Sequence, residues 1–249
     1  MMDDPTGTVL ALFAAFCRIG GCILVMPGFS SARIPSQIRL FMAVAVSIAL
    51  TPILWNTIYP KVSGQAIDYI EMIAVETSVG VVIGLITRFY VMGLQFTGTI
   101  ISMSIGFNAP PMPDIIEDSA ENQLTNMLSF AGLLILFLLD FHHIVFKALV
   151  DSYGAIPIGG VFHVQKALIT LTDTLQATFM VMLRLGSPFL LYGLIFNVAI
   201  GFINKLAPQI PVFFISAPYL IMGGLILLYF GVASMLSLFA DGFLPIFGG

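Results

Sequence analysis

Charged residues are scarce in this sequence. Only 9% of its 249 residues are charged, whereas 59% are hydrophobic and the mean hydropathy is +1.04. A soluble globular domain carries roughly 25% charged residues. The composition therefore excludes an ordinary soluble protein, and lipid or partner subunits must cover much of the apolar surface.

Basic clusters and cysteine frameworks are also lacking. Nine Lys and Arg stand against 13 Asp and Glu, a net charge of −4, and the Lys and Arg are dispersed. Nucleic acid is not an expected partner, because its binding depends on clustered Lys and Arg. The two cysteines, Cys17 and Cys22, fall on different faces of one apolar segment, so they indicate neither a disulfide framework nor a metal site.

Enzyme signatures are missing as well. The sequence has no HExxH, no zinc-spaced Cys/His cluster, no GxSxG and no phosphate-binding Gly-rich loop. His142 and His143 are adjacent and should point to different helix faces, which disfavours a shared metal. Asp140, Asp151 and Asp173 lie near the ends of apolar segments. We predict no enzymatic activity, catalytic residue, metal or cofactor.

Long apolar segments are abundant, and a membrane-spanning helix needs about 20 such residues. Six segments qualify or nearly qualify: 8–26, 40–60, 70–107, 122–139, 171–204 and 211–240. The third is too long for one span, so it is either one long tilted helix or a helix that leaves the bilayer. The fold class is an all-α membrane protein with long helical hairpins, and the start of the chain lacks the basic region of a cleaved signal peptide.

Ionisable residues lie well inside these segments, away from their ends: Arg18, Glu76, Arg88 and Arg184. A charged side chain at a bilayer centre costs about 2.5 to 3.5 kcal/mol on insertion scales. In a transporter such residues mark a substrate or proton path, whereas in an assembly subunit they pair with neighbours. Proton relays usually use carboxylates and three of these four are arginines, so we favour buried charge pairing and hence a complex.

Small residues recur at four-residue spacing, which lets membrane helices approach closely. The rows are Gly80 and Gly84, then Gly98, Ser102 and Gly106, then Gly193, Asn197 and Gly201. Such rows are common in helical membrane proteins, so they indicate tight packing and not a particular function.

The segment 107–121 cannot form a regular helix, because it holds Pro110, Pro111 and Pro113. One interpretation is structural: Asp114 and Glu117 cap the helix that follows. The other is functional: an irregular loop lines a cavity, since nonhelical backbone at membrane depth needs cover from protein or water. The two interpretations are compatible.

Three motifs stand in a fixed order along nearly the whole chain. The first contains Arg18, Pro27, Phe29, Arg33, Ile34, Pro35 and Arg39; the second contains Asp151, Ser152 and Tyr153 with 156–159; the third contains Asn204, Lys205, Leu206, Ala207, Pro208 and Gln209 and continues to Phe213. Together they resemble the FliR family, the export-gate subunits of flagellar type III secretion, called SctT in virulence systems.

The resemblance implies a function and partners. Family members form a secretion pore in the bacterial inner membrane, at the flagellar basal body, for unfolded flagellar subunits. A single copy assembles there with several copies of FliP-like and FliQ-like subunits, beside the FlhA-like and FlhB-like export proteins. Residues 1–170 then correspond to a FliP-like part and 171–249 to a FliQ-like hairpin of one integral unit. The turn near Pro208 lies at the hairpin tip, where Asn204 and Gln209 satisfy free backbone groups.

The resemblance also implies a loop that helps plug the closed pore, within the region 106–121. By position its residues are Gly106, Phe107, Asn108, Ala109, Pro110, Pro111, Met112 and Pro113. Apolar Phe107 and Met112 suit a seal, since a Met side chain fits irregular gaps.

Alternatives remain at this stage. A proton-coupled transporter of a small solute would use Glu76 or Asp140, and an intramembrane enzyme would need a nucleophile and base that the sequence lacks. A virulence-system subunit is also possible, although Asn204 and the stretch 211–214 favour the flagellar one.

Overall fold

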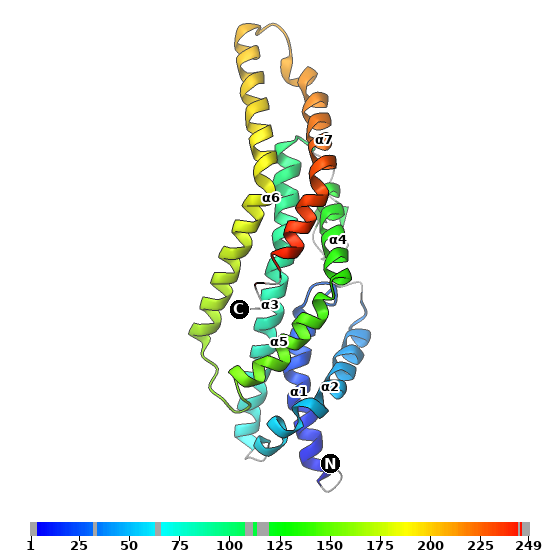
Figure 1. The fold of residues 1–249 in the computed structure, drawn as a ribbon, viewed down its shortest axis with the longest axis vertical. Coiled ribbons are helices and arrows are strands. Elements are labelled where there is room, and N and C mark those ends of the chain that lie inside the picture. Colours follow the sequence, from blue (N-terminus) through cyan, green and yellow to red (C-terminus); the bar gives the residue numbers. More distant parts are fainter. Residues whose placement is uncertain are drawn as a thin grey trace. The chain divides into compact units, whose positions relative to one another are not determined.

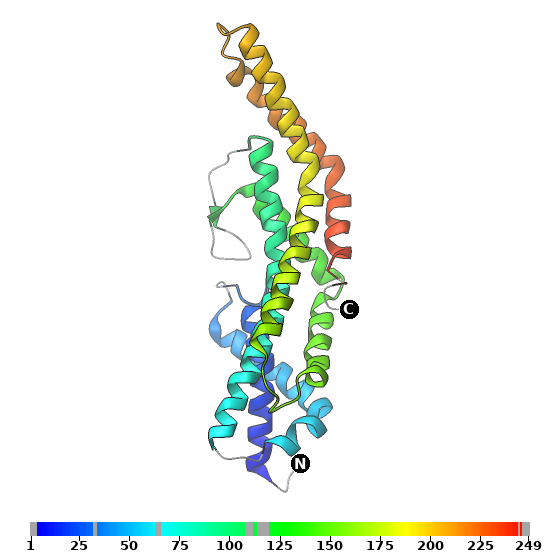
Figure 2. The ribbon, with the colours of Figure 1, turned by 90° about the vertical axis from the view of Figure 1, so that its left-hand side faces the viewer.

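The computed structural model describes residues 4–31, 34–62, 66–107, 112–113, 120–243 and 245, and helices dominate these ranges. The helices are α1 (Pro5–Val25), α2 (Ser36–Ile58), the short 3-10 helix η1 (Tyr59–Lys61), α3 (Ala66–Ser104), α4 (Gln123–Leu138), α5 (Phe141–Ala155), α6 (Val164–Leu206) and α7 (Val212–Asp241) (Figure 1). Strands β1 (Met112–Pro113) and β2 (Ala120–Glu121) pair in the connection between α3 and α4 (Figure 2). The predicted all-α fold class is confirmed.

Among the described residues, five helical segments are long and apolar enough to cross a membrane, and α4 with α5 would make a sixth as one broken span. This agrees with the prediction of about six segments. The long third segment is a single continuous helix, because α3 runs for 39 residues without a break. Its length exceeds the roughly 20 residues that one crossing requires.

The chain divides into two compact units. Unit 1 contains residues 1–89 and 140–175, and unit 2 contains residues 90–139 and 176–249. Helices α3 and α6 each supply a segment to both units. The predicted division near residue 170 rests on the family resemblance and not on compactness, so it stays a prediction.

Helix α1 forms the centre of unit 1. Asp4 caps its N-terminus by accepting a hydrogen bond from the Gly7 N–H at 3.1 Å. One face of α1 packs into the hydrophobic core of the unit, which is built largely from small and branched side chains. The core residues are Ala11, Ala14, Ala15, Ile19, Ile23, Ala43, Leu54, Ile58, Val62, Met72, Tyr153 and Ile158.

Glycines bring α1 and α3 into backbone contact. A Cβ at Gly84 would lie 2.8 Å from the Cys22 carbonyl oxygen, and one at Gly80 would overlap the Arg18 carbonyl group. This row of small residues therefore packs against α1, as close membrane-helix packing requires.

Unit 2 has an aromatic core. The Tyr90 ring stacks on Phe239 of α7 with centroids 4.9 Å apart, and the Tyr90 hydroxyl donates to the Phe239 carbonyl oxygen. Gly132 of α4 leaves room for Leu94, and Gly193 of α6 lies against the Ser104 carbonyl group. Small residues again set the helix spacing.

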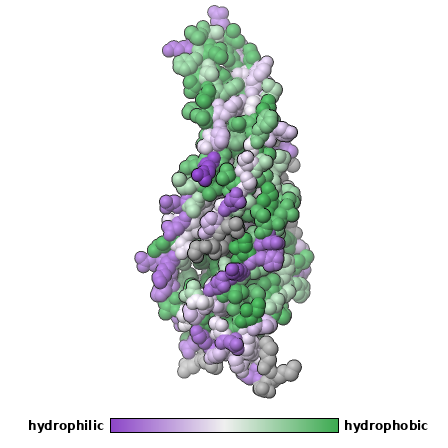
Figure 3. Space-filling model, in the orientation of Figure 1, coloured by the Kyte–Doolittle hydropathy of each residue, from purple (hydrophilic) through white to green (hydrophobic). Residues whose placement is uncertain are grey.

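Helices α6 and α7 form the hairpin predicted for the last two apolar segments (Figure 1). Between the two helices, the Tyr192 hydroxyl donates to the Leu220 carbonyl oxygen at 2.9 Å. Both helices expose many large apolar side chains, and on the face in Figure 3 apolar residues cover much of the hairpin. Lipid or other proteins must cover this surface.

Candidate functional site

The loop predicted to plug a pore begins at a well-defined helix end. At the C-terminus of α3, the Phe107 N–H donates to the Ser102 carbonyl oxygen at 2.9 Å and the Gly106 N–H to that of Met103 at 3.3 Å. Gly106 has φ +70°, so these contacts form a Schellman motif with the glycine in its left-handed position. A residue with a Cβ would be strained there.

Asn122 closes the other end of the loop. Its side-chain oxygen accepts from the Leu124 N–H at 3.0 Å and caps α4, and its amide group donates to the Phe107 carbonyl oxygen at 2.8 Å. One side chain thus ties the two ends of the loop together. Asn122 therefore caps α4, the helix that follows the loop. We had predicted Asp114 and Glu117 as its cap, but they are not; both acids lie outside the described residues.

A short antiparallel ladder lies between these ends. Met112 pairs with Glu121, and Pro113 pairs with Ala120. Gly106 and Phe107 belong to the described neck, whereas the predicted plug residues Asn108, Ala109, Pro110 and Pro111 lie outside the described residues. Between two long apolar helices, the neck and the ladder fix where this segment leaves the helices and where it returns.

A buried ion pair occupies the core of unit 1. Arg18 Nε donates to Glu76 Oε2 at 2.7 Å and Arg18 Nη2 donates to Oε1 at 2.9 Å, and both side chains are 0% exposed. The pair is bidentate, the strongest geometry for Arg with a carboxylate. Since a lone buried charge is costly, each residue makes the burial of the other possible.

The second motif completes this site. Arg18 Nη1 donates to Ser152 Oγ at 2.9 Å, Nη2 donates to the Ile156 carbonyl oxygen at 2.9 Å, and the Tyr153 ring lies 3.8 Å from the guanidinium carbon. Ile156 ends α5, where a positive charge is favourable. The structure thus joins the first and second motifs around one guanidinium, a pairing that the sequence reasoning missed although both motifs were visible.

The other two arginines of the apolar helices differ from Arg18. Arg88 is half-buried on α3 and has interactions of its own. Arg184 is exposed on α6. The charge pairing predicted for Arg184 in a complex stays a prediction.

The rest of the first motif forms the link between α1 and α2. Pro27 is buried in the turn after α1, and Pro35 is the residue before the first turn of α2. Arg39 Nη2 donates to the carbonyl oxygens of Ser31 at 2.8 Å and Ile34 at 3.3 Å, which fixes the linker to α2. Arg33 lies outside the described residues.

The third motif forms the turn of the α6–α7 hairpin. Helix α6 ends at Leu206, and Pro208 follows in the turn. Backbone groups satisfy one another: the Ala207 N–H donates to Ile203 at 2.9 Å and the Ile210 N–H to Ala207 at 3.1 Å. These contacts satisfy backbone groups that we expected the side chains of Asn204 and Gln209 to satisfy. The motif residues Asn204, Lys205 and Gln209 are half-buried or exposed.

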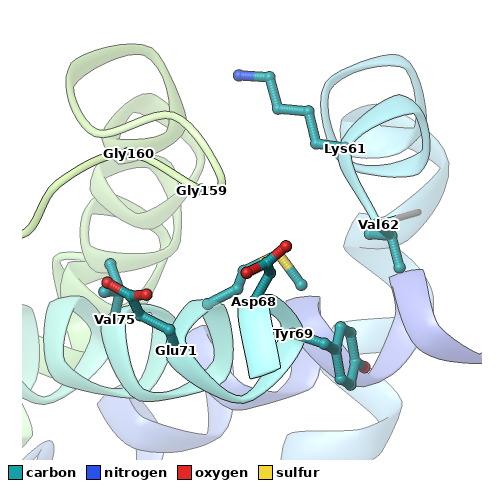
Figure 4. Close-up of a pocket in the computed structure, with 9 residues that line it drawn as sticks. Lys61, Val62, Asp68, Tyr69, Glu71, Val75, Gly159 and Gly160 are labelled. Atoms are coloured by element: carbon teal, nitrogen blue, oxygen red, sulfur yellow. The ribbon is translucent and has the colours of Figure 1, made fainter. Parts of the chain in front are cut away.

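A cavity of about 270 Å³ opens in unit 1 beside the start of α3. Lys61 of η1 and the acids Asp68 and Glu71 of α3 line it, across from the backbone of Gly159 and Gly160 (Figure 4). Acidic and basic side chains both line this cavity, so its lining does not favour ligands of one charge.

Two histidines and an aspartate meet where α5 begins. The ligand atoms of Asp140, His142 and His143 all lie within 4.8 Å of one another. The two imidazole centroids are 4.3 Å apart. This differs from our expectation that the adjacent histidines point to different faces, because both rings lie beside Asp140 in the first turn of α5.

Comparison with known proteins identifies the family. A model described as bacterial export proteins, family 1, matches residues 9–245. The chain belongs to this family. The matched range contains the link between α1 and α2, the loop and the hairpin, so all three motifs lie within it.

Curated relatives of this export family carry the name flagellar biosynthetic protein FliR. The Caulobacter vibrioides protein is 27% identical over 231 residues, with 91% of this chain and 90% of the relative covered. The Escherichia coli protein is 25% identical over 216 residues, covering 87% and 82%. The Bacillus subtilis protein is 21% identical over 222 residues, covering 88% and 84%. The resemblance to the FliR family is confirmed.

Membership in the export family agrees with the architecture. A bacterial export protein with five long apolar helices is a membrane-embedded export component. Within the matched residues 9–245, this chain has a buried ion pair, a tied loop and an apolar hairpin.

Proposed function

We propose that this chain is a non-enzymatic subunit of the flagellar protein export gate in the bacterial inner membrane. With FliP-like and FliQ-like subunits it forms the pore through which unfolded flagellar subunits pass, and its loop near 106–113 helps to close that pore at rest. The names of the curated relatives support the flagellar assignment over the virulence one.

The observation that carries the proposal is the tied neck of the loop. A plug must be irregular enough to fill a pore and must still return to one place. The Gly106 helix stop and the Asn122 bond to Phe107 hold the two ends of the loop together. The ladder between β1 and β2 shortens the free part of the loop, which lowers the entropy lost when it closes.

Partner subunits are supported by the surface of the hairpin. Phe214, Tyr229 and Phe230 of α7 are 84%, 77% and 77% exposed. Aromatic side chains of this kind are enriched at protein interfaces. The proposed FliP-like and FliQ-like neighbours would cover them, and the FlhA-like and FlhB-like proteins would complete the apparatus.

A proton-coupled transporter is less well supported. Such a protein needs a carboxylate that exchanges protons with water. Glu76 is fully buried and both of its oxygens accept from Arg18. This arrangement suits a structural ion pair and not a proton carrier.

Ion leakage through the assembled gate tests the plug. Deleting residues 107–113 should raise leakage in cells that express the complete gate, measured as ion-dependent growth inhibition or dye uptake. Asn122→Asp keeps the oxygen that caps α4 but removes the donor to Phe107, so it should raise leakage to a smaller extent.

Asn197→Asp is the matched control. Asn197 donates to the Gly193 carbonyl oxygen at 2.7 Å on α6, so this change makes the same chemical replacement away from the loop and should leave leakage at the wild-type level. Unchanged leakage in the deletion variant, at equal gate abundance, would refute the plug. Failure of the chain to copurify with FliP-like and FliQ-like subunits would refute the gate assignment itself.

A further inference from the structure

The junction of α4 and α5 has an unusual backbone. Helix α4 ends at Leu138, α5 begins at Phe141, and Asp140 between them has φ 56° and ψ 33°. Among the described residues it is the only non-glycine residue with a positive φ. This conformation is unfavourable for an L-residue, so an interaction of its side chain is expected to compensate for the backbone strain.

Capping does not supply that role. Asp140 occupies the N-cap position of α5, where an aspartate usually accepts from a backbone N–H of the first turn. Its side chain makes no such capping hydrogen bond within the described chain. The carboxylate instead faces the two histidines that follow it: Oδ1 lies 3.6 Å from His143 Nδ1 and 3.9 Å from His142 Nε2.

These separations are longer than hydrogen bonds and slightly longer than the spacing of ligand atoms around a bound ion. Direct N–H···O hydrogen bonds have lengths of about 2.7 to 3.2 Å. Around tetrahedral zinc, bonds of roughly 2.0 to 2.1 Å place the ligand atoms about 3.3 Å apart. All three ligand atoms here lie within 4.8 Å of one another, so small side-chain rotations bring them into bonding range.

On the isolated chain, the three side chains differ in exposure. The Asp140 and His143 side chains are each 71% exposed, and His142 is 25% exposed. Phe146 packs edge-on against the His142 ring with centroids 6.5 Å apart. One ligand is therefore oriented by packing, while the other two remain accessible to an incoming ion.

We propose that Asp140, His142 and His143 bind one divalent transition-metal ion, with zinc the best match. Two imidazoles and a carboxylate form a ligand set that zinc accepts, and three protein ligands leave a fourth position for water. The ion joins the residue that breaks the helix to the first turn of α5. It thereby stabilises the left-handed backbone of Asp140.

Metal titration of the purified full-length chain in detergent micelles tests the site. After chelator treatment, zinc is added in competition with a chromophoric indicator, and cobalt is added separately to read the coordination geometry by visible absorption. The wild-type chain should bind one zinc per chain and give a tetrahedral cobalt spectrum. His142→Gln and His143→Gln should each weaken zinc binding roughly tenfold or more.

Two further variants separate metal binding from folding. Asp140→Gly keeps the left-handed backbone, which glycine adopts readily, but removes the carboxylate, so it should fold normally and bind zinc weakly. His163→Gln is the matched control, because His163 is the third histidine of the chain and is exposed before α6. Its zinc affinity should equal that of the wild type. Absence of stoichiometric zinc binding by the wild-type chain, or binding unchanged in all three cluster variants, would overturn the proposal.

Discussion

Helices α1 and α7 have nearly the same apolar character but different surroundings. The mean hydropathy of their most apolar windows is 2.2 and 2.0, yet 56% of that window is buried in α1 and 22% in α7. Helix α1 is rich in small residues that admit neighbouring backbones, whereas α7 directs large aromatic side chains outward. Equal hydropathy therefore serves two purposes: α1 builds the core of its own unit, and α7 presents a surface for lipid or partners.

The difference extends to charge. Arg18 on α1 is fully buried and fully paired, whereas Arg184 on α6, the other arm of the hairpin, is exposed. A buried charge is tolerable only where the chain supplies its partner. Substitutions in the two regions should therefore differ in their effect on the free energy of unfolding.

The largest loss should follow from breaking the ion pair. Glu76→Ala leaves the Arg18 guanidinium buried without its carboxylate, which should destabilise the chain by about 3 to 5 kcal/mol. Thermal unfolding in detergent measures the effect. The double change Arg18→Met with Glu76→Leu should recover most of the loss, because it removes both charges.

Arg184→Ala is the control for charge removal. It should change the free energy of unfolding by no more than about 0.5 kcal/mol, as expected for an exposed position. If Arg184→Ala lowered the free energy of unfolding as much as Glu76→Ala, the contrast between the paired core and the exposed arm would be wrong.

Two phenylalanines on α7 allow the stability contributed by the aromatic core of unit 2 to be compared with that contributed by the outer surface of the same helix. Phe239 is 1% exposed and stacks on Tyr90, whereas Phe230 is 77% exposed. Phe239→Ala should cost about 3 to 5 kcal/mol through the cavity it leaves. Phe230→Ala should barely alter unfolding of the isolated chain but should reduce recovery of the chain in the assembled complex. A large stability loss for Phe230→Ala would show that its face is internal.

Replacing each of two glycines by alanine should change the free energy of unfolding by a smaller amount, and in opposite directions. In Gly201→Ala the new methyl group meets no atom within 4 Å among the described residues, so the better helix propensity of alanine should stabilise the chain by about 0.5 to 1 kcal/mol. In Gly80→Ala the methyl group overlaps the Arg18 carbonyl group, and the overpacking should destabilise by about 1 to 3 kcal/mol. We expect the two substitutions to change the free energy of unfolding in opposite directions. Changes in the same direction would contradict backbone contact between α1 and α3.

Much of the helical framework could be predicted because hydropathy and proline placement act locally. The predicted segment 122–139 matches α4 and its cap Asn122, and 211–240 matches α7 within one or two residues. The prediction was less accurate where apolar character does not mark a helix boundary. Helix α6 begins at Val164, seven residues before the predicted start at Leu171, because polar and charged residues such as Lys166 extend the helix without interrupting it.

The sites were harder to predict than the helices. The sequence marked Arg18 and Glu76 as costly residues in apolar segments but did not connect them to Ser152 or Ile156, because contacts across 134 and 138 positions depend on how α1, α3 and α5 pack. Similarly, a loop broken by prolines was visible, but the Asn122 bond across its neck was not.

The sequence by itself determined that this protein is an apolar bundle of long helices with a proline-rich interruption and too little charge for water, because composition and periodicity set those properties locally. Only the tertiary structure decided which arginine is buried, which apolar helix is covered and which three side chains meet at the start of α5. The first two outcomes depend on packing between segments far apart in the chain. The third depends on the left-handed backbone of Asp140, which composition and periodicity do not reveal.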